Sequence, residues 1–131
     1  MSNDEIIQQV LGTDAQKNID KISDSSPELA KLIKEHAYED IYGRGSLSLK
    51  MKELAAVACL VGSGDNGLPI KAHFKGMLNV GWSLSEIKDL LVFLTIYIGY
   101  PKIINALFSL EEIEQETTMA NLQQNHQETG L

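Results

Sequence analysis

Residues 47–107, LSLKMKELAAVACLVGSGDNGLPIKAHFKGMLNVGWSLSEIKDLLVFLTIYIGYPKIINAL, decide the fold of this chain. Apolar residues recur in this stretch at helical spacing, and short runs of glycine, serine, aspartate and proline interrupt the pattern. The stretch therefore predicts three apolar helices joined by short turns. A single histidine, His73, lies near the otherwise apolar start of the middle helix. Its imidazole is either the proton-handling group of an enzyme or a packed side chain bonded to a backbone carbonyl.

Local signals predict where these helices begin and end. Ser48 is the predicted N-cap of the first helix. The sequence SLSE at residues 83–86 matches a capping box, in which the serine accepts from first-turn amides and the glutamate reaches back. The run VFLTIYI at residues 92–98 is rich in β-branched side chains and could form a strand, but the cap and the helical stripe favour a helix. Gly99 and Pro101 then end this helix and open the next.

The flanking segments complete an all-α prediction. Residues 3–22 predict a polar N-terminal helix, or two short helices broken at Gly12. Ser26 and Pro27 open a further helix, which Gly43 ends. The polar tail, residues 118–131, is expected to fray. We therefore predict a single domain over residues 1–131, a compact bundle of about six helices with its core at about residues 25–116.

The composition argues against several classes of protein. With 131 residues, of which 44% are hydrophobic, the chain can bury a real aliphatic core. Its net charge of −7 and its single arginine, Arg44, argue against a nucleic-acid partner, which needs a clustered basic face. No apolar run reaches the roughly 20 residues of a membrane span, and the N-terminus lacks a signal-peptide pattern. We therefore expect a cytoplasmic protein that does not bind a membrane.

Candidate metal and thiol chemistry is sparse in this sequence. The only cysteine, Cys59, excludes an intrachain disulfide, and its alanine-rich apolar helix predicts an inert core thiol. His36 and Asp40 are four positions apart on one predicted helix, a spacing that permits metal binding. Since no third ligand is evident, no metal site is predicted.

Four pieces of the sequence, taken in order, resemble a known family. They are LS-x-K-x-x-E-L-x-A-x-A at residues 47–58, H-x-x-x-x-L-N-x-G at 73–81, S-x-x-E-I at 83–87 and Y-x-G-x-P at 97–101. Each piece alone is common, but their order and spacing are fairly specific. Over residues 36–115 the chain is similar to the carboxymuconolactone decarboxylase family, which implies an alkylhydroperoxidase D-like all-helical fold.

The resemblance points to one of the two branches of that family. The alkylhydroperoxidase D-like branch uses a C-x-x-C pair a few residues before the histidine. In this chain Asn66 and Pro69 stand at those places, so disulfide exchange cannot run. The branch without the cysteines keeps the histidine, and this chain resembles that branch.

The resemblance implies a decarboxylase that needs no metal or organic cofactor and acts on a small carboxylated lactone of the 4-carboxymuconolactone type. His73 would deliver the proton, and Glu53 would orient His73 or serve as a second acid or base. Arg44 would grip a substrate carboxylate with its guanidinium. Tyr42 and Tyr97 would donate to an enolate or line the pocket. No cofactor is implied because the unsaturated lactone itself accepts the electrons.

Each of these roles has a structural alternative. His73 could be a packed core residue, Arg44 an exposed loop residue and Glu53 a solvated first-turn glutamate favoured by the helix dipole. The two tyrosines could be packing residues. For the whole protein, the alternative is a family member that binds a small molecule or assembles without catalysis. A thiol peroxidase or reductase is disfavoured because the C-x-x-C pair is absent.

The resemblance also implies self-association as a trimer or hexamer. The apolar segments 54–61 and 90–98 agree with it, because they carry more apolar surface than a small monomer needs to hide. The expected partners are therefore further copies of this chain and a small-molecule substrate.

Overall fold

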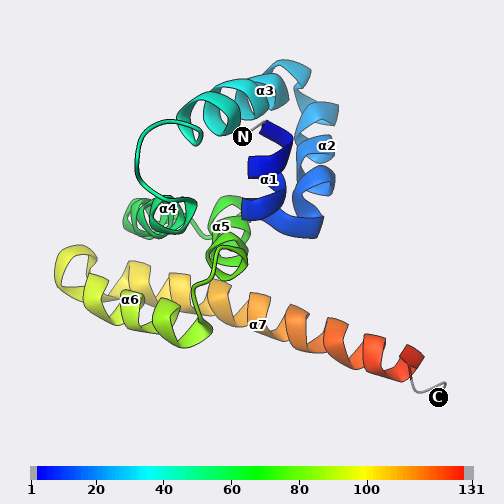
Figure 1. The fold of residues 1–131 in the computed structure, drawn as a ribbon. Coiled ribbons are helices and arrows are strands. Elements are labelled where there is room, and N and C mark those ends of the chain that lie inside the picture. Colours follow the sequence, from blue (N-terminus) through cyan, green and yellow to red (C-terminus); the bar gives the residue numbers. More distant parts are fainter. Residues whose placement is uncertain (1–2, 129–131) are drawn as a thin grey trace.

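Helix α5 lies at the centre of the chain, with the N-terminal helices on one side and the two C-terminal helices on the other (Figure 1). The computed structural model describes residues 3–128. In chain order its elements are α1 (Asn3–Leu11), the 3₁₀ turn η1 (Gly12–Asp14), α2 (Ala15–Ser25), α3 (Pro27–Leu32), the π-helical segment η2 (Ile33–Ile41), α4 (Leu49–Ser63), α5 (Leu68–Asn79), α6 (Leu84–Ile98) and α7 (Tyr100–Glu128). Within these residues every regular element is a helix. The all-α prediction is confirmed.

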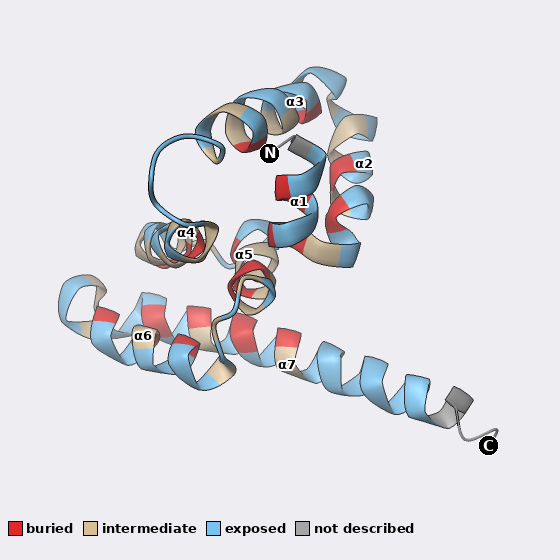
Figure 2. Cartoon of the chain, in the orientation of Figure 1, coloured by how far each residue is buried: buried red, intermediate tan, exposed pale blue. Residues whose placement is uncertain are grey.

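Two hydrophobic cores flank α5, as the buried residues of Figure 2 show. The larger core joins α4, α5, α6 and α7, and Phe74 of α5 is fully buried in it. The smaller core joins α1 and η2, and Ala72 of α5 packs against it. Because α5 contributes to both cores, side chains on the turn between Ala72 and Phe74 lie where the two halves meet. That turn carries His73.

The predicted caps are present. Ser48 Oγ accepts a hydrogen bond from the Met51 amide at 3.1 Å, and Ser26 Oγ accepts one from the Leu29 amide at 3.1 Å. The capping box of α6 is complete, with both reciprocal bonds between Ser83 and Glu86. These are local signals, which is why the sequence placed the helix starts correctly.

The structure differs from the sequence expectations at two places. Helix α7 continues to Glu128, so the segment 118–128 that was expected to fray is helical; residues 129–131 lie outside the described part. Cys59 is exposed, so the predicted core thiol is wrong. Because the alanines around Cys59 are also apolar, the sequence pattern did not show which side of α4 faces inward. The buried side carries Val57 and Val61. In residues 3–128, no helix has the combined length and apolar character needed to cross a bilayer.

Candidate active site

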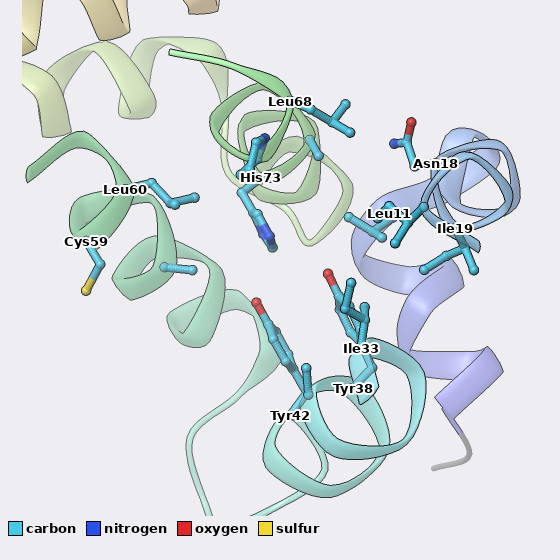
Figure 3. Close-up of a pocket in the computed structure, with 15 residues that line it drawn as sticks. Leu11, Asn18, Ile19, Ile33, Tyr38, Tyr42, Cys59, Leu60, Leu68 and His73 are labelled. Carbon is cyan, nitrogen blue, oxygen red and sulfur yellow. The ribbon is translucent and has the colours of Figure 1, made fainter. Parts of the chain in front are cut away.

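A cavity of about 430 Å³ lies between η2, α2, α4 and α5 (Figure 3). Most of its lining is aliphatic, from residues such as Leu11, Ile19 and Leu60. Its polar lining is a small set: Asn18, Tyr38, Tyr42, Cys59 and His73. A concave apolar site with a few convergent polar groups is the usual form of a small-molecule site.

His73 reaches this cavity from α5 and is paired with Glu53 of α4. The His73 Nδ1 atom lies 2.8 Å from Glu53 Oε2 and 3.0 Å from Glu53 Oε1. The Glu53 side chain is fully buried, and 18% of the His73 side chain is exposed. A buried carboxylate must have partners, and here the imidazole is its closest one. With Nδ1 bound to Glu53, the other ring nitrogen, Nε2, is available for a substrate.

Gly76 makes room for the buried carboxylate. A Cβ atom placed on Gly76 would lie 2.9 Å from Glu53 Oε1, closer than real Cβ atoms come to a neighbour, and 3.2 Å from Glu53 Cδ, which is an unusually tight contact. Gly76 follows His73 by three positions on α5, so the two residues share one helix face. The Glu53 carboxylate therefore packs directly against that face of α5. It contacts the imidazole of His73 and the backbone of Gly76.

Two stacked tyrosines form the opposite wall of the cavity. The rings of Tyr38 and Tyr42 have centroids 4.8 Å apart and planes inclined by 20°. The Tyr42 hydroxyl lies 3.5 Å from Glu53 Oε1, a long hydrogen bond. Burial, followed by the nearby Glu53 charge, raises the pKa of both phenols well above their ordinary value. Both hydroxyls therefore stay protonated at neutral pH and can donate hydrogen bonds.

The fold brings together three of the five residues singled out from the sequence, namely His73, Glu53 and Tyr42. It does not bring Arg44 or Tyr97 to the cavity. The Arg44 side chain is 70% exposed in the loop after η2, where its Nε donates to Asp40 Oδ1 at 2.7 Å. That hydrogen bond lowers the pKa of Asp40. Tyr97 is 74% exposed on α6, beside Phe93.

Sequence reasoning missed Tyr38. It lies four positions before Tyr42, and that spacing on one helix was the available signal. It also missed that Glu53 is buried, because a glutamate side chain is normally solvated. Among the described residues no group of three His, Cys, Asp or Glu side chains could hold a metal ion; His36 and Asp40 approach only to 4.0 Å, on the surface.

The structure thus shows an all-helical chain with a buried Glu–His pair at an apolar cavity. Comparison of its sequence with known proteins identifies the family. The model described as the carboxymuconolactone decarboxylase family matches residues 27–112, and the chain belongs to that family. It is also similar to the 4-carboxymuconolactone decarboxylase of Acinetobacter baylyi (strain ATCC 33305 / BD413 / ADP1). The two are 22% identical over 117 residues, which cover 88% of this chain and 87% of that protein. The family resemblance stated from the motifs is thus confirmed.

Proposed function

We propose that this chain is a cofactor-free carboxy-lyase that acts on a small carboxylated lactone of the 4-carboxymuconolactone type, with His73 as the proton donor. The observation that carries the proposal is the Glu53–His73 pair, whose imidazole lines the cavity while its Nδ1 is held by a buried carboxylate. The decarboxylase of Acinetobacter baylyi, to which the chain is similar over most of both lengths, supports the substrate class.

The proposed reaction breaks one carbon–carbon bond and forms one carbon–hydrogen bond. As carbon dioxide leaves, the bonding electron pair moves into the unsaturated lactone and gives a dienolate. The protonated His73 then transfers its Nε2 proton to the ring carbon, and the electron pair of the dienolate forms the new bond. The neutral imidazole regains a proton from water. Glu53 is a positioning residue in this scheme, because it fixes the ring through Nδ1–H and stabilises the imidazolium.

The test is decarboxylation of 4-carboxymuconolactone by the purified chain, followed as release of carbon dioxide. His73→Ala is expected to lower kcat by about 10²–10⁴-fold, the usual contribution of a general acid. His36→Ala is the matched control, because His36 is exposed and does not line the cavity. It should keep wild-type kinetics. Turnover by His73→Ala at the wild-type rate would refute the assignment of the proton donor.

Arg44 remains a separate question within this proposal. The sequence assigns it to a substrate carboxylate, yet in the single chain it pairs with Asp40 outside the cavity. Comparing Arg44→Ala with the wild type decides between the two. If Arg44→Ala raises KM by about tenfold or more, Arg44 binds the substrate, because that is the effect expected for loss of a charge-assisted hydrogen bond. An unchanged KM would leave it as a loop residue.

A non-catalytic ligand-binding role is the alternative, and one observation favours it. The described residues that line the cavity include no lysine or arginine, so a substrate with several carboxylates would lose solvation there with little compensation. In this reading the chain binds a compact, weakly charged ring compound without changing it. Saturable binding of the lactone with no release of carbon dioxide would support this alternative over the carboxy-lyase.

A further inference from the structure

The Tyr38 side chain is largely buried, and its hydroxyl faces the cavity. Only 5% of the Tyr38 surface is exposed, and the residue lines the cavity. Figure 3 shows its hydroxyl oxygen directed into the open space, toward the side on which the His73 ring lies. Among the described residues no buried side-chain oxygen or nitrogen lacks a hydrogen-bond partner, so this hydroxyl, which forms no hydrogen bond with another described residue, is accessible from the cavity. A hydroxyl directed into a cavity is available to bond a ligand atom that enters it.

The neighbouring Tyr42 differs from Tyr38 in where its hydroxyl is directed. The Tyr42 hydroxyl is directed at Glu53 and contributes to the carboxylate's surroundings. The stacked rings are held 4.8 Å apart, so the Tyr38 ring is fixed by its neighbour before any ligand binds. A donor that is already in place costs little conformational entropy when it forms its bond.

The electrostatic surroundings define which atom this hydroxyl would bind. Burial and the Glu53 charge raise the pKa of Tyr38, so the group stays a neutral O–H donor. It therefore needs an acceptor. Most of the remaining lining is aliphatic, so the acceptor is expected to belong to a compact ring compound. A lactone carbonyl oxygen meets both requirements.

We propose that Tyr38 binds the substrate by donating a hydrogen bond to the carbonyl oxygen of its lactone ring. This inference rests on the proposed carboxy-lyase function and names the group that receives the developing charge. When carbon dioxide leaves, the electron pair moves toward that oxygen, and the bond from Tyr38 becomes a bond to an oxyanion. His73 then supplies the proton to carbon from its place beside the same cavity.

The binding test uses two neutral ring compounds that differ in the carbonyl group. Coumarin has a lactone carbonyl, and 2H-chromene has the same fused rings without it. Tyr38→Phe removes only the hydroxyl oxygen. It is expected to weaken coumarin binding by about 5–10-fold, the value of one neutral hydrogen bond, and to leave chromene binding unchanged. Isothermal titration calorimetry measures both, and His36→Ala, at an exposed residue outside the cavity, is the control.

Equal affinity of wild type and Tyr38→Phe for coumarin would overturn the inference. So would equal weakening of coumarin and chromene, since that pattern means a change of cavity shape. Failure of the wild type to bind coumarin would contradict it as well. The unfolding temperature of Tyr38→Phe should match that of wild type, because the ring stack is kept.

The kinetic test separates this inference from the proposed function. With 4-carboxymuconolactone, Tyr38→Phe should lower kcat by about tenfold, in addition to its effect on binding. The reason is that a hydrogen bond to an oxyanion is roughly twice as strong as one to a neutral carbonyl. If coumarin discrimination holds but the wild type releases no carbon dioxide, the carboxy-lyase fails and the carbonyl site stands. If the wild type turns over through His73 but Tyr38→Phe is unaffected, only the role of Tyr38 fails.

Discussion

Gly76 has a role that no side chain could take. The Glu53 carboxylate occupies the space where a Cβ of residue 76 would lie, at 2.9 Å from Oε1. Elsewhere in a helix, replacing glycine by alanine stabilises by about 0.5–1 kcal/mol. At this position the methyl group must displace a fully buried carboxylate instead. The glycine therefore keeps the Glu53–His73 pair in place.

We predict that Gly76→Ala lowers the free energy of unfolding by about 1–3 kcal/mol, the usual cost of overpacking a core. It should also lower kcat more than it changes KM, because the misplaced carboxylate acts through His73 and not on the substrate. Urea unfolding and steady-state kinetics measure the two effects.

Gly62→Ala is the matched control for this substitution. A Cβ at Gly62 would meet Ile98 Cδ1 at 3.8 Å, an ordinary contact. It should therefore raise the free energy of unfolding by about 0.5–1 kcal/mol and leave kcat unchanged. If Gly76→Ala stabilises the protein as much as Gly62→Ala does, the close approach of Glu53 is not a constraint.

The two cavity tyrosines predict a decline of stability in alkaline solution. Their pKa values are raised in the folded chain by burial and then by Glu53, whereas the unfolded chain releases phenol protons at about pH 10. Their contribution to stability is therefore complete below about pH 10. It declines as the pH rises further, because the unfolded state then binds fewer protons than the folded state.

Urea unfolding over this range should show a steeper loss of stability for wild type than for Tyr38→Phe/Tyr42→Phe. The slope of the unfolding free energy against pH should differ between the two proteins by an amount that corresponds to about two protons. Parallel curves for the two proteins would show that neither phenol is protected in the folded state.

At the scale of single residues, the sequence allowed us to predict side chains whose chemistry is unusual for their position. His73 could be predicted because an imidazole in an apolar helix is conspicuous, and Glu53 because it belongs to a motif. Tyr38 and Gly76 could not be predicted, since a tyrosine in an amphipathic helix and a glycine in a helix each have common structural explanations. Their roles depend on contacts between elements that are distant in the sequence.

Among the elements, those with local end signals were predicted best. Helices α4 and α6 begin at the serines that the sequence selected, because a cap is set by residues within one turn. The π-helical segment η2 has no comparable signal in its sequence. Its wider backbone spacing is seen in the bond from the Tyr42 amide to the Ala37 carbonyl, five residues back. Segments of this kind are frequent at functional sites. This one carries Tyr38 and is followed directly by Tyr42, the other member of the stack.

The cap of α4 should matter for the site because this helix carries Glu53. Ser48→Ala removes the side-chain acceptor of the Met51 amide and is predicted to lower the free energy of unfolding by about 1 kcal/mol. Ser46→Ala, in the loop just before the cap, is the control and should change stability by less than about 0.5 kcal/mol. Thermal unfolding of both variants checks the prediction. Equal stability of the two would mean that the cap is not needed to hold α4.

At the scale of the whole molecule, one face of the structure is unusually apolar. Val92, Phe93, Ile96 and Tyr97 of α6 are between 57% and 75% exposed, and their spacing places them on one side of the helix. Tyr100, Ile104 and Phe108 continue the exposed apolar surface along the start of α7. We call these seven residues the α6–α7 face. Soluble monomers rarely expose a contiguous patch of this kind.

We predict that the α6–α7 face is covered by another copy of this chain, in the trimer or hexamer that the family resemblance implies. Light scattering of the eluting protein should give a mass that is a multiple of 14.5 kDa. Phe93→Glu/Ile96→Glu should lower that mass, because burying two carboxylates in an interface is unfavourable without partners. Ser85→Glu, which adds a carboxylate to α6 outside this face, should not. A mass of one chain at every concentration would contradict the prediction, and so would an undiminished mass in the double variant.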